Sequence, residues 1–222
     1  MAPSLLTMLR FELGTALPLS LAVLRRRLSG AELASALFGY TRRSLSDPFA
    51  ALGPAADPAE TFTRRQLRPV LALSDALRLD AGLDPERCQA LLLEIVAQSG
   101  AEFLRSTLEL PSLAHWISLG DPARRALVEG LLARFPNAES VLGQVGDGGL
   151  DFEVRSCWFA ALAQRLERPE VAALFCEADQ RFFGDPAVGI ELTRPQTLAR
   201  GGHSCSFYLR YVGAEPQKLD IT

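Results

Sequence analysis

The spacing of apolar residues changes near Pro136, and this change constrains the fold more than any other feature of the sequence. Before Pro136, apolar residues recur every three or four positions, which is the spacing of one buried helix face. The clearest series is Cys88, Leu91, Leu92, Ile95, Val96 and Phe103. After Pro136, residues 150–155 alternate between apolar and charged, which is the two-residue repeat of a half-buried strand. A helical part therefore precedes a part that contains strands.

Local signals mark where several predicted helices begin. Ser29 and Glu32 have the spacing of a capping box, and the helix that they open is predicted to run to about Leu45. Asp-Pro pairs at 84–85 and 121–122 each combine a capping carboxylate with a proline suited to a first turn. The intervening segment 46–60, rich in Pro, Ala and Asp, is predicted to be a loop. We therefore expect residues 1–136 to be mainly helical.

The remaining segment, residues 137–222, is predicted to contain three strands and two helices. In chain order these are a strand at 150–154, helices at about 158–166 and 169–184, and strands at 190–192 and 205–211. Because the elements do not alternate as βαβ units, we expect a small, mainly antiparallel sheet with helices on one side. The whole chain, residues 1–222, is predicted to be a single α+β domain.

Charge and apolar content exclude several classes of function. The net charge of −3 lacks the basic surplus that binds phosphate backbones, so we expect no nucleic-acid partner. The apolar run 13–24 is about half as long as a membrane-crossing helix needs to be. Three arginines follow this run, whereas a signal peptide carries its positive charge first. We therefore expect a cytoplasmic protein without a membrane segment, and the sequence leaves a homo-oligomer open.

The four cysteines show no metal-binding or redox spacing. Cys88, Cys157, Cys176 and Cys205 are far apart in the sequence and form no CxxC pair, so we expect reduced thiols and no metal. The P-loop, the dinucleotide-binding fingerprint, GxSxG and HExxH are also absent, and no cofactor is expected. Evidence for an enzyme must therefore come from other residues.

Three short motifs near the C-terminus point to a known family. They are Phe175-Cys176-Glu177-Ala178-Asp179, Leu192-Thr193-Arg194-Pro195-Gln196-Thr197-Leu198 and Gly201-Gly202-His203-Ser204-Cys205-Ser206-Phe207. Together they resemble the L-2-amino-thiazoline-4-carboxylic acid hydrolase family, in which a helix ending near an acidic residue precedes an RTxT segment, a glycine turn and a strand that begins CDF. The resemblance covers about residues 150–210. It has two departures, because Pro195 replaces the first Thr of RTxT and Ser206 replaces the Asp of CDF.

The resemblance implies that water opens a five-membered thiazoline ring at its C=N carbon, giving an N-carbamoyl amino acid with a free thiol. It implies a small-molecule substrate, with Cys205 and Asp179 as the candidate catalytic residues. Cys205 shares a strand face with Phe207 and Leu209, so it is either a small core residue or a nucleophile. In the second case, N–H groups of the glycine turn and His203 would lower the thiol pKa.

Asp179 lies three residues after Cys176 and shares its helix face. Apolar neighbours would raise the pKa of this carboxyl and suit it to general acid or base catalysis, whereas the alternative is an exposed helical carboxylate. Arg194 has paired donors that suit a substrate carboxylate, and its alternative is an exposed arginine on an edge strand.

The remaining candidate residues are assigned to substrate binding. With Arg194, these are Cys157, Cys176, Thr197 and His203. Cys157 follows a strand directly, so it lies near the pocket or packs under Trp158. The function predicted first is a hydrolase of thiazolines or related cyclic amidines, in which N–H groups of the glycine turn stabilise the developing charge. The alternative is a non-catalytic small-molecule-binding or scaffold domain, which Ser206 favours.

Overall fold

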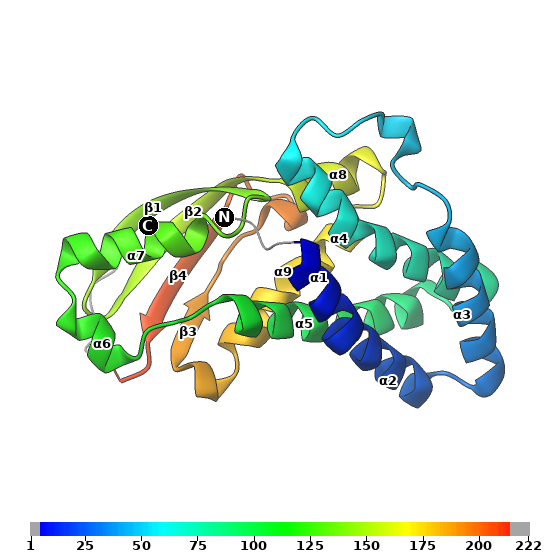
Figure 1. Ribbon diagram of the computed structural model, residues 1–222, viewed down its shortest axis with the longest axis horizontal. Coiled ribbons are helices and arrows are strands. Elements are labelled where there is room, and N and C mark those ends of the chain that lie inside the picture. The colour runs from blue at the N-terminus through cyan, green and yellow to red at the C-terminus, as the bar shows by residue number, and fades with distance from the viewer. Residues whose placement is uncertain (1–4, 214–222) are drawn as a thin grey trace.

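The computed structural model describes residues 5–213, which form an α+β fold with a helical part and a four-stranded antiparallel sheet (Figure 1). The helices before the sheet are α1 (Leu5–Phe11), α2 (Leu17–Arg27), α3 (Gly30–Ser44), α4 (Pro58–Asp75), α5 (Pro85–Thr107), α6 (Leu113–Ser118) and α7 (Asp121–Leu132). The elements that follow are β1 (Ala138–Gly146), β2 (Gly149–Cys157), α8 (Trp158–Arg165), α9 (Pro169–Phe183), β3 (Ile190–Thr193) and β4 (Cys205–Tyr211). The predicted fold class is confirmed.

The helix starts predicted from the sequence are confirmed at α3 and α5. The Ser29 hydroxyl accepts a hydrogen bond from the backbone N–H of Glu32 at 3.3 Å, and the Glu32 carboxylate accepts one from the N–H of Ser29 at 2.8 Å. At the start of α5, the Asp84 carboxylate accepts a bond of 2.8 Å from the N–H of Arg87. These bonds satisfy amide groups that a helix N-terminus leaves without partners.

The sheet has the strand order β1-β2-β4-β3, and each neighbouring pair is antiparallel. The last strand, β4, pairs with β2 along most of its length, with Leu209 opposite Leu150 and Phe207 opposite Phe152. The two phenyl rings stack with their centroids 4.5 Å apart. Because residues opposite each other point to the same face, this register places the apolar residues of both strands on one side.

Strand β1 is the element that the periodicity did not predict. It lies at one edge of the sheet and pairs only with β2, and none of its residues is fully buried. Its pairing has two register irregularities, one after Glu139 and one between Leu142 and Val145. An edge strand with these irregularities does not need a regular apolar alternation, so the sequence carries no strong strand signal there.

Helices α5 and α9 approach each other closely. A Cβ atom added at Gly100 of α5 would lie 2.4 Å from the Cβ of Ala178 in α9, which is too short for two carbon atoms. The absence of a side chain at Gly100 therefore permits this spacing. Asp179 is the residue after Ala178, so this contact between the two helices also influences where Asp179 lies relative to α5.

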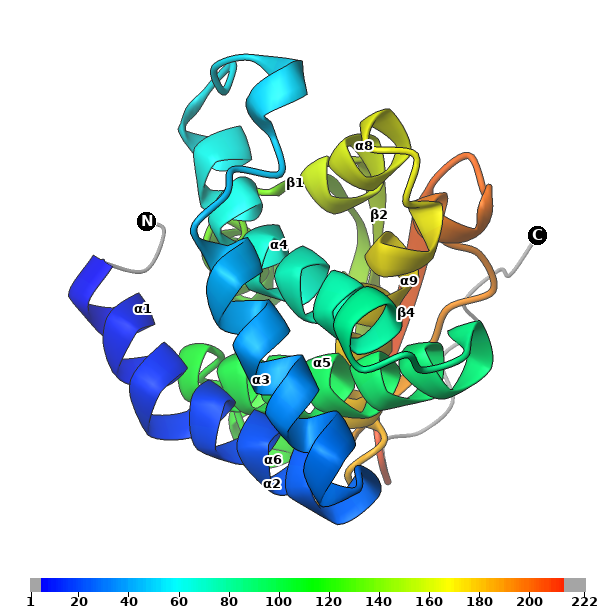
Figure 2. The ribbon, with the colours of Figure 1, turned by 90° about the vertical axis from the view of Figure 1, so that its right-hand side faces the viewer.

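The N-terminal helix is longer than the apolar run suggested. Elements α1, a π-helical segment η1 (Glu12–Ala16) and α2 follow one another without a break (Figure 2). By length and composition alone, the 22 residues Leu6–Arg27 are sufficient to cross a membrane, which corrects the expectation of a run about half that length. Only 11% of the most apolar window in this helix is buried, and Leu13 is 65% exposed.

Candidate functional site

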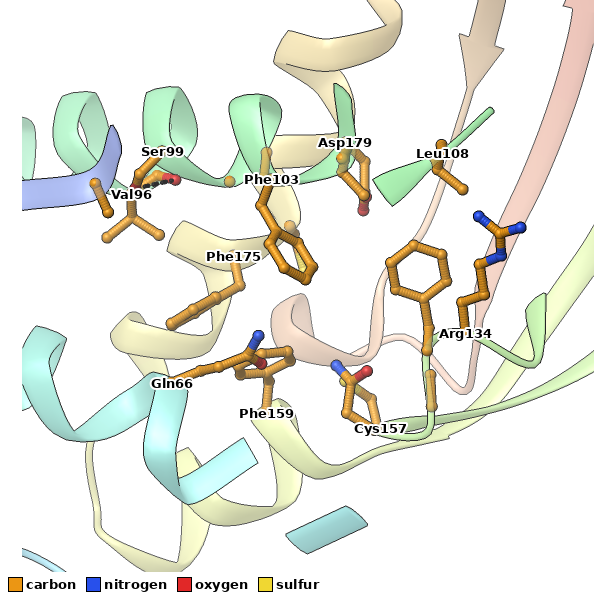
Figure 3. A pocket seen from close by; sticks show the side chains of 18 of the residues that line it. Gln66, Val96, Ser99, Phe103, Leu108, Arg134, Cys157, Phe159, Phe175 and Asp179 are labelled. Carbon is orange, nitrogen blue, oxygen red and sulfur yellow. Dashed lines mark hydrogen bonds between the residues drawn. The ribbon is translucent and has the colours of Figure 1, made fainter. Parts of the chain in front are cut away.

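A cavity of about 740 Å³ lies between the helical part and the sheet (Figure 3). Side chains of α1, α2, α4, α5, α8 and α9 and of all four described strands contribute to its wall. Most of this wall is apolar, and its aromatic members include Phe11, Phe62, Phe103, Phe135, Phe152, Phe159, Phe175 and Phe183. A volume of this size falls in the range of about 300–1,000 Å³ that small-molecule sites occupy.

The apolar spacing in the sequence also predicts six nearly fully buried core residues, and the structure confirms three of them. Leu92, Ile95 and Phe207 are buried as predicted. Phe152, Phe175 and Leu209 were also expected to be nearly fully buried, but each is only partly buried. All three line the cavity, but so do the buried Leu92, Ile95 and Phe207, so a place in the cavity wall does not by itself decide whether a side chain is fully buried. Periodicity identifies the inward face of an element, but it does not show whether that face meets packed atoms or a cavity.

The structure brings five of the predicted site residues to this cavity. Cys157 ends β2, Cys176 and Asp179 lie one turn apart on α9, Arg194 follows β3 and Cys205 begins β4. These elements are distant in the sequence, and antiparallel pairing brings the ends of β2 and β4 together, with Val154 opposite Cys205. The charges of the cluster influence one another, since the Asp179 carboxylate contributes to raising the pKa of all three thiols.

Arg194 binds Asp179 directly. One nitrogen of the Arg194 guanidinium donates to Oδ2 of Asp179 at 2.7 Å, and the other donates to the carbonyl oxygen of Cys176 at 2.7 Å. The guanidinium also lies 5.2 Å from the centre of the Phe207 ring. These contacts join α9 to β4, and the Arg194 side chain is only 6% exposed. Its donors are therefore directed at protein atoms, whereas the sequence suggested a substrate carboxylate.

The Asp179 carboxylate is more basic than an ordinary surface carboxylate. Burial raises the pKa of Asp179 to about 6, and the Arg194 guanidinium opposes this rise only in part. At neutral pH the carboxylate is therefore mostly ionised, but it holds a proton more strongly than an ordinary aspartate. A carboxylate with a pKa near the working pH is suited to general base catalysis.

The Cys205 thiol is buried and accepts a hydrogen bond from the backbone. The N–H of Leu198 donates to Sγ of Cys205 at 3.2 Å. Burial raises the pKa of this thiol, whereas the Leu198 N–H and the nearby Arg194 guanidinium lower it. The net direction is upward, so the thiol remains protonated at neutral pH unless a base removes its proton.

The other two thiols of the cavity are also protonated at neutral pH. Burial raises the pKa of Cys176 to about 12. Burial also raises the pKa of Cys157, although the N–H groups of Ala160 and Phe159 in the first turn of α8 oppose this rise. Of the three, Cys205 and Cys157 receive backbone N–H groups, but Cys176 has no such stabilisation of its thiolate. Cys176 is therefore the least suitable nucleophile.

Thr197 and His203 lie outside the lining of the cavity. His203 is exposed, so it does not approach the Cys205 thiol as expected. Thr197 is 5% exposed, and its hydroxyl has no hydrogen-bond partner among the described residues.

The glycine turn also differs from the expectation. The N–H of Gly201 donates to the carbonyl of Leu198 and that of Gly202 to the carbonyl of Thr197, at 3.2 and 2.9 Å. Because internal bonds already use these two groups, they are not free to stabilise charge on a substrate, which corrects that assignment. The amide that does reach the cluster, Leu198 N–H, comes from the segment before the turn.

Two polar residues that the motifs did not indicate also line the cavity. Half-buried Arg134 donates to the carbonyl oxygen of Thr107 at 2.7 Å, and within residues 5–213 no ion pair is recorded for it. Gln66 has a buried Oε1 atom without a hydrogen-bond partner among the described residues, and its amide faces the cavity in Figure 3. Both belong to the helical part, whose sequence shows packing patterns but no ligand-binding motif.

The described residues contain no group of three or more His, Cys, Asp or Glu side chains arranged to hold a metal ion. The cluster at the cavity consists of thiols, one carboxylate and one guanidinium, and the guanidinium neutralises the carboxylate. Groups of these kinds are suited to proton transfer and nucleophilic attack.

Comparison with known proteins gives one match. A sequence model of the family described as L-2-amino-thiazoline-4-carboxylic acid hydrolase matches residues 70–209. This range contains all the cavity cysteines, Asp179, Arg194 and Arg134, but it begins inside α4 and leaves out the helices before it. No curated protein and no solved structure matches the chain.

Proposed function

Because the chain belongs to the L-2-amino-thiazoline-4-carboxylic acid hydrolase family, we propose that it hydrolyses a thiazoline or a related cyclic amidine carboxylate at the ring C=N carbon. One observation carries this proposal beyond the family name. Asp179 has a pKa of about 6 and shares its cavity with the Cys205 thiol. A base that is ionised at neutral pH therefore lies near a nucleophile that needs one.

In the proposed reaction, the Asp179 carboxylate accepts a proton as a nucleophile attacks the ring carbon. The nucleophile is the Cys205 sulfur or a water molecule. Attack converts the C=N carbon to a tetrahedral centre, and the carbon–sulfur bond of the ring then breaks. The leaving sulfur takes a proton and becomes a free thiol, and one water molecule is consumed in total. Where Cys205 attacks, the amidine carbon is first bound to its sulfur. Water then adds to this carbon, the bond to the Cys205 sulfur breaks, and the carbamoyl product and the Cys205 thiol are released.

Two arginines have separate roles in this proposal. Arg194 holds Asp179 in place, because its guanidinium is bonded to Oδ2 of Asp179 and to the carbonyl of Cys176. Arg134 lines the cavity and has no recorded carboxylate partner among residues 5–213, so we assign the substrate carboxylate to it. An arginine with free paired donors binds a carboxylate in a defined orientation.

The competing function is binding without catalysis. It is favoured by the raised pKa of all three cavity thiols and by Ser206, which replaces the aspartate of the family motif. Ser206 is partly buried and receives a hydrogen bond of 3.3 Å from the Gln196 amide. This residue is therefore part of a neutral polar contact, where a family aspartate would add a negative charge.

Hydrolysis of L-2-amino-thiazoline-4-carboxylate tests the choice between these functions. The release of free thiol would be measured, and the product identified by mass spectrometry. Asp179→Asn should reduce kcat/KM by about 10²- to 10⁴-fold, which is the usual contribution of a general base. Glu177→Gln is the matched control, because it removes another carboxylate of α9 that is also paired with an arginine, Arg200, but does not line the cavity. No thiol release by the wild type would favour the binding function, whereas equal activity of both variants would show that Asp179 is not the base.

A further inference from the structure

We infer that the substrate carries a long apolar group attached to its reacting polar ring. This inference rests on the proposed function and specifies the class of its substrate. It follows from the size of the cavity, the distribution of its polar residues and the origin of its apolar wall. The substrate class is a thiazoline carboxylate with a long hydrocarbon chain on the C=N carbon.

The cavity is too large for a simple thiazoline carboxylate. L-2-amino-thiazoline-4-carboxylate has about nine non-hydrogen atoms and takes up roughly the space of six water molecules, at about 30 Å³ each. It would fill only about a quarter of the 740 Å³ cavity. A small polar ligand that leaves most of an apolar wall in contact with water gains little binding energy from that wall. The remaining volume therefore calls for a second, apolar part of the ligand.

The reactive groups lie toward one end of the cavity. In the view of Figure 3, Asp179 and Arg134 lie on the right, Val96 and Ser99 lie on the left, and Phe103 lies between the two pairs. A ligand that reaches both ends therefore needs a polar head and an apolar chain. The rest of the wall also contains uncharged polar side chains. Gln66 and the partner-bonded Ser99 lie toward the left of Figure 3, and Ser20, Tyr40 and Ser44 line the cavity as well.

Much of the apolar wall comes from helices that precede the family match. The lining residues before position 70 include Met8, Phe11, Leu13, Ala16, Leu17, Leu21, Leu24, Leu37, Phe62 and Pro69. Three charged residues also lie on this side. Glu12 and Arg65 bond each other at 2.9 and 3.1 Å, and Arg68 donates to two backbone carbonyl oxygens at 3.0 and 3.1 Å, so none of the three requires a charged ligand. The part of the chain shared with the family thus supplies the reactive end, and the N-terminal helices extend the cavity with apolar surface.

The chain belongs on the C=N carbon because that position leaves the ring carboxylate free for Arg134. Water then adds to the C=N carbon of a 2-alkyl-thiazoline-4-carboxylate, and the carbon–sulfur bond breaks. The carbon becomes the carbonyl of an amide, the ring nitrogen becomes its N–H, and the sulfur leaves as a thiol. The product is an N-acyl cysteine, formed with one water molecule and without an oxidant or a cofactor.

Two substrates and two serine variants test the inference. The substrates are 2-undecyl- and 2-methyl-thiazoline-4-carboxylate, and binding of dodecanoate is measured separately by calorimetry. Ser99→Phe would fill the apolar end of the cavity with a ring. Ser106→Phe is its matched control, because Ser106 lies on the same helix and bonds a backbone carbonyl in the same way, but is exposed and does not line the cavity.

The wild type should show at least about a hundredfold higher kcat/KM for the undecyl than for the methyl compound, because each buried methylene adds binding energy. Ser99→Phe should reduce this preference about tenfold or more, whereas Ser106→Phe should leave it unchanged. Equal kcat/KM values for both chain lengths would overturn the inference.

The outcome for dodecanoate separates this inference from the proposed function. If no thiazoline is hydrolysed but dodecanoate binds to the wild type and to Ser106→Phe, and not to Ser99→Phe, the hydrolase proposal fails and the apolar ligand class is supported. If thiazolines are hydrolysed but dodecanoate does not bind and chain length has no effect, the hydrolase proposal stands and this inference fails.

Discussion

The two ends of the cavity differ in both chemistry and origin. The end formed by α9, β4 and the segment after β3 carries the thiols, Asp179 and Arg194, and lies within the family match at residues 70–209. The other wall is formed largely by helices before residue 70 and is mainly apolar. The reactive groups thus lie in the part of the chain that the family model matches, and much of the apolar surface lies before it. Activity and ligand choice should therefore respond to substitutions in different parts of the chain.

The largest expected effect concerns the reactive end. Cys205→Ser nearly preserves volume but replaces the thiol with a much weaker nucleophile, so turnover should fall about a thousandfold or more if the sulfur attacks the ring carbon. Cys176→Ser is the matched control, because the pKa of the Cys176 thiol is about 12 and this thiol does not serve as the nucleophile. Steady-state kinetics per folded molecule would measure both variants. Undiminished turnover in Cys205→Ser would assign the attack to water activated by Asp179.

The second prediction concerns stability on both sides of the cavity. Leu92→Ala in α5 and Phe207→Ala in β4 should each lower the free energy of unfolding by about 2–5 kcal/mol, because both side chains are buried. Leu93→Ala is the control, since Leu93 is 39% exposed and should cost less than about 1 kcal/mol. Urea denaturation followed by circular dichroism would measure the three values. Losses below about 1 kcal/mol at both buried positions would show that this core is assigned incorrectly.

A third prediction concerns pH and again separates the two ends. Because Asp179 acts as a base only when ionised, kcat/KM should fall about tenfold per pH unit below its pKa of about 6. An ordinary aspartate would show this limb about two units lower. Binding of an apolar ligand without an ionisable group should not follow the same curve, since the apolar wall does not ionise over this range. A limb near pH 4 would imply that Asp179 is not the base.

The smallest expected effect lies on the helical wall. Gln66→Leu removes a buried oxygen that has no hydrogen-bond partner among the described residues, so the free protein should become more stable by up to about 1 kcal/mol. The matched control is Gln89→Leu, because Gln89 donates to the carbonyl of Glu170 at 3.5 Å and does not line the cavity. Thermal unfolding of both variants would measure the difference. Destabilisation by Gln66→Leu would show that the amide has a structural partner in solution.

Sequence patterns predicted those features that depend on neighbouring residues. The capping box at Ser29 and the Asp84 cap depend on residues three apart, and the alternation in β2 and β4 follows from strand geometry. Strand β1 escaped prediction because an irregular edge strand needs no regular apolar pattern. Local geometry was therefore predictable from the sequence, whereas the pairing of an irregular edge strand was not.

Three-dimensional features of the site were harder to predict. The position of Cys205 and Asp179 on the inward faces followed from spacing and resemblance, but the partners of Arg194 depend on how α9 packs against the sheet. His203 was placed in the site because it lies two residues from Cys205, whereas the turn directs it to solvent. The cavity itself left no pattern, since residues that face open space are as apolar as residues that face packed atoms.

The close approach at Gly100 makes the position of Asp179 sensitive to a residue that has no functional group. A methyl group there would act as a wedge against Ala178 and displace α9, and Asp179 would move with its helix. Substitution of Gly100 should therefore reduce activity in the way that substitution of a reactive residue does, although Gly100 supplies neither a proton nor a nucleophile. Reaction geometry in this molecule thus depends on an interhelical spacing as well as on the groups that react.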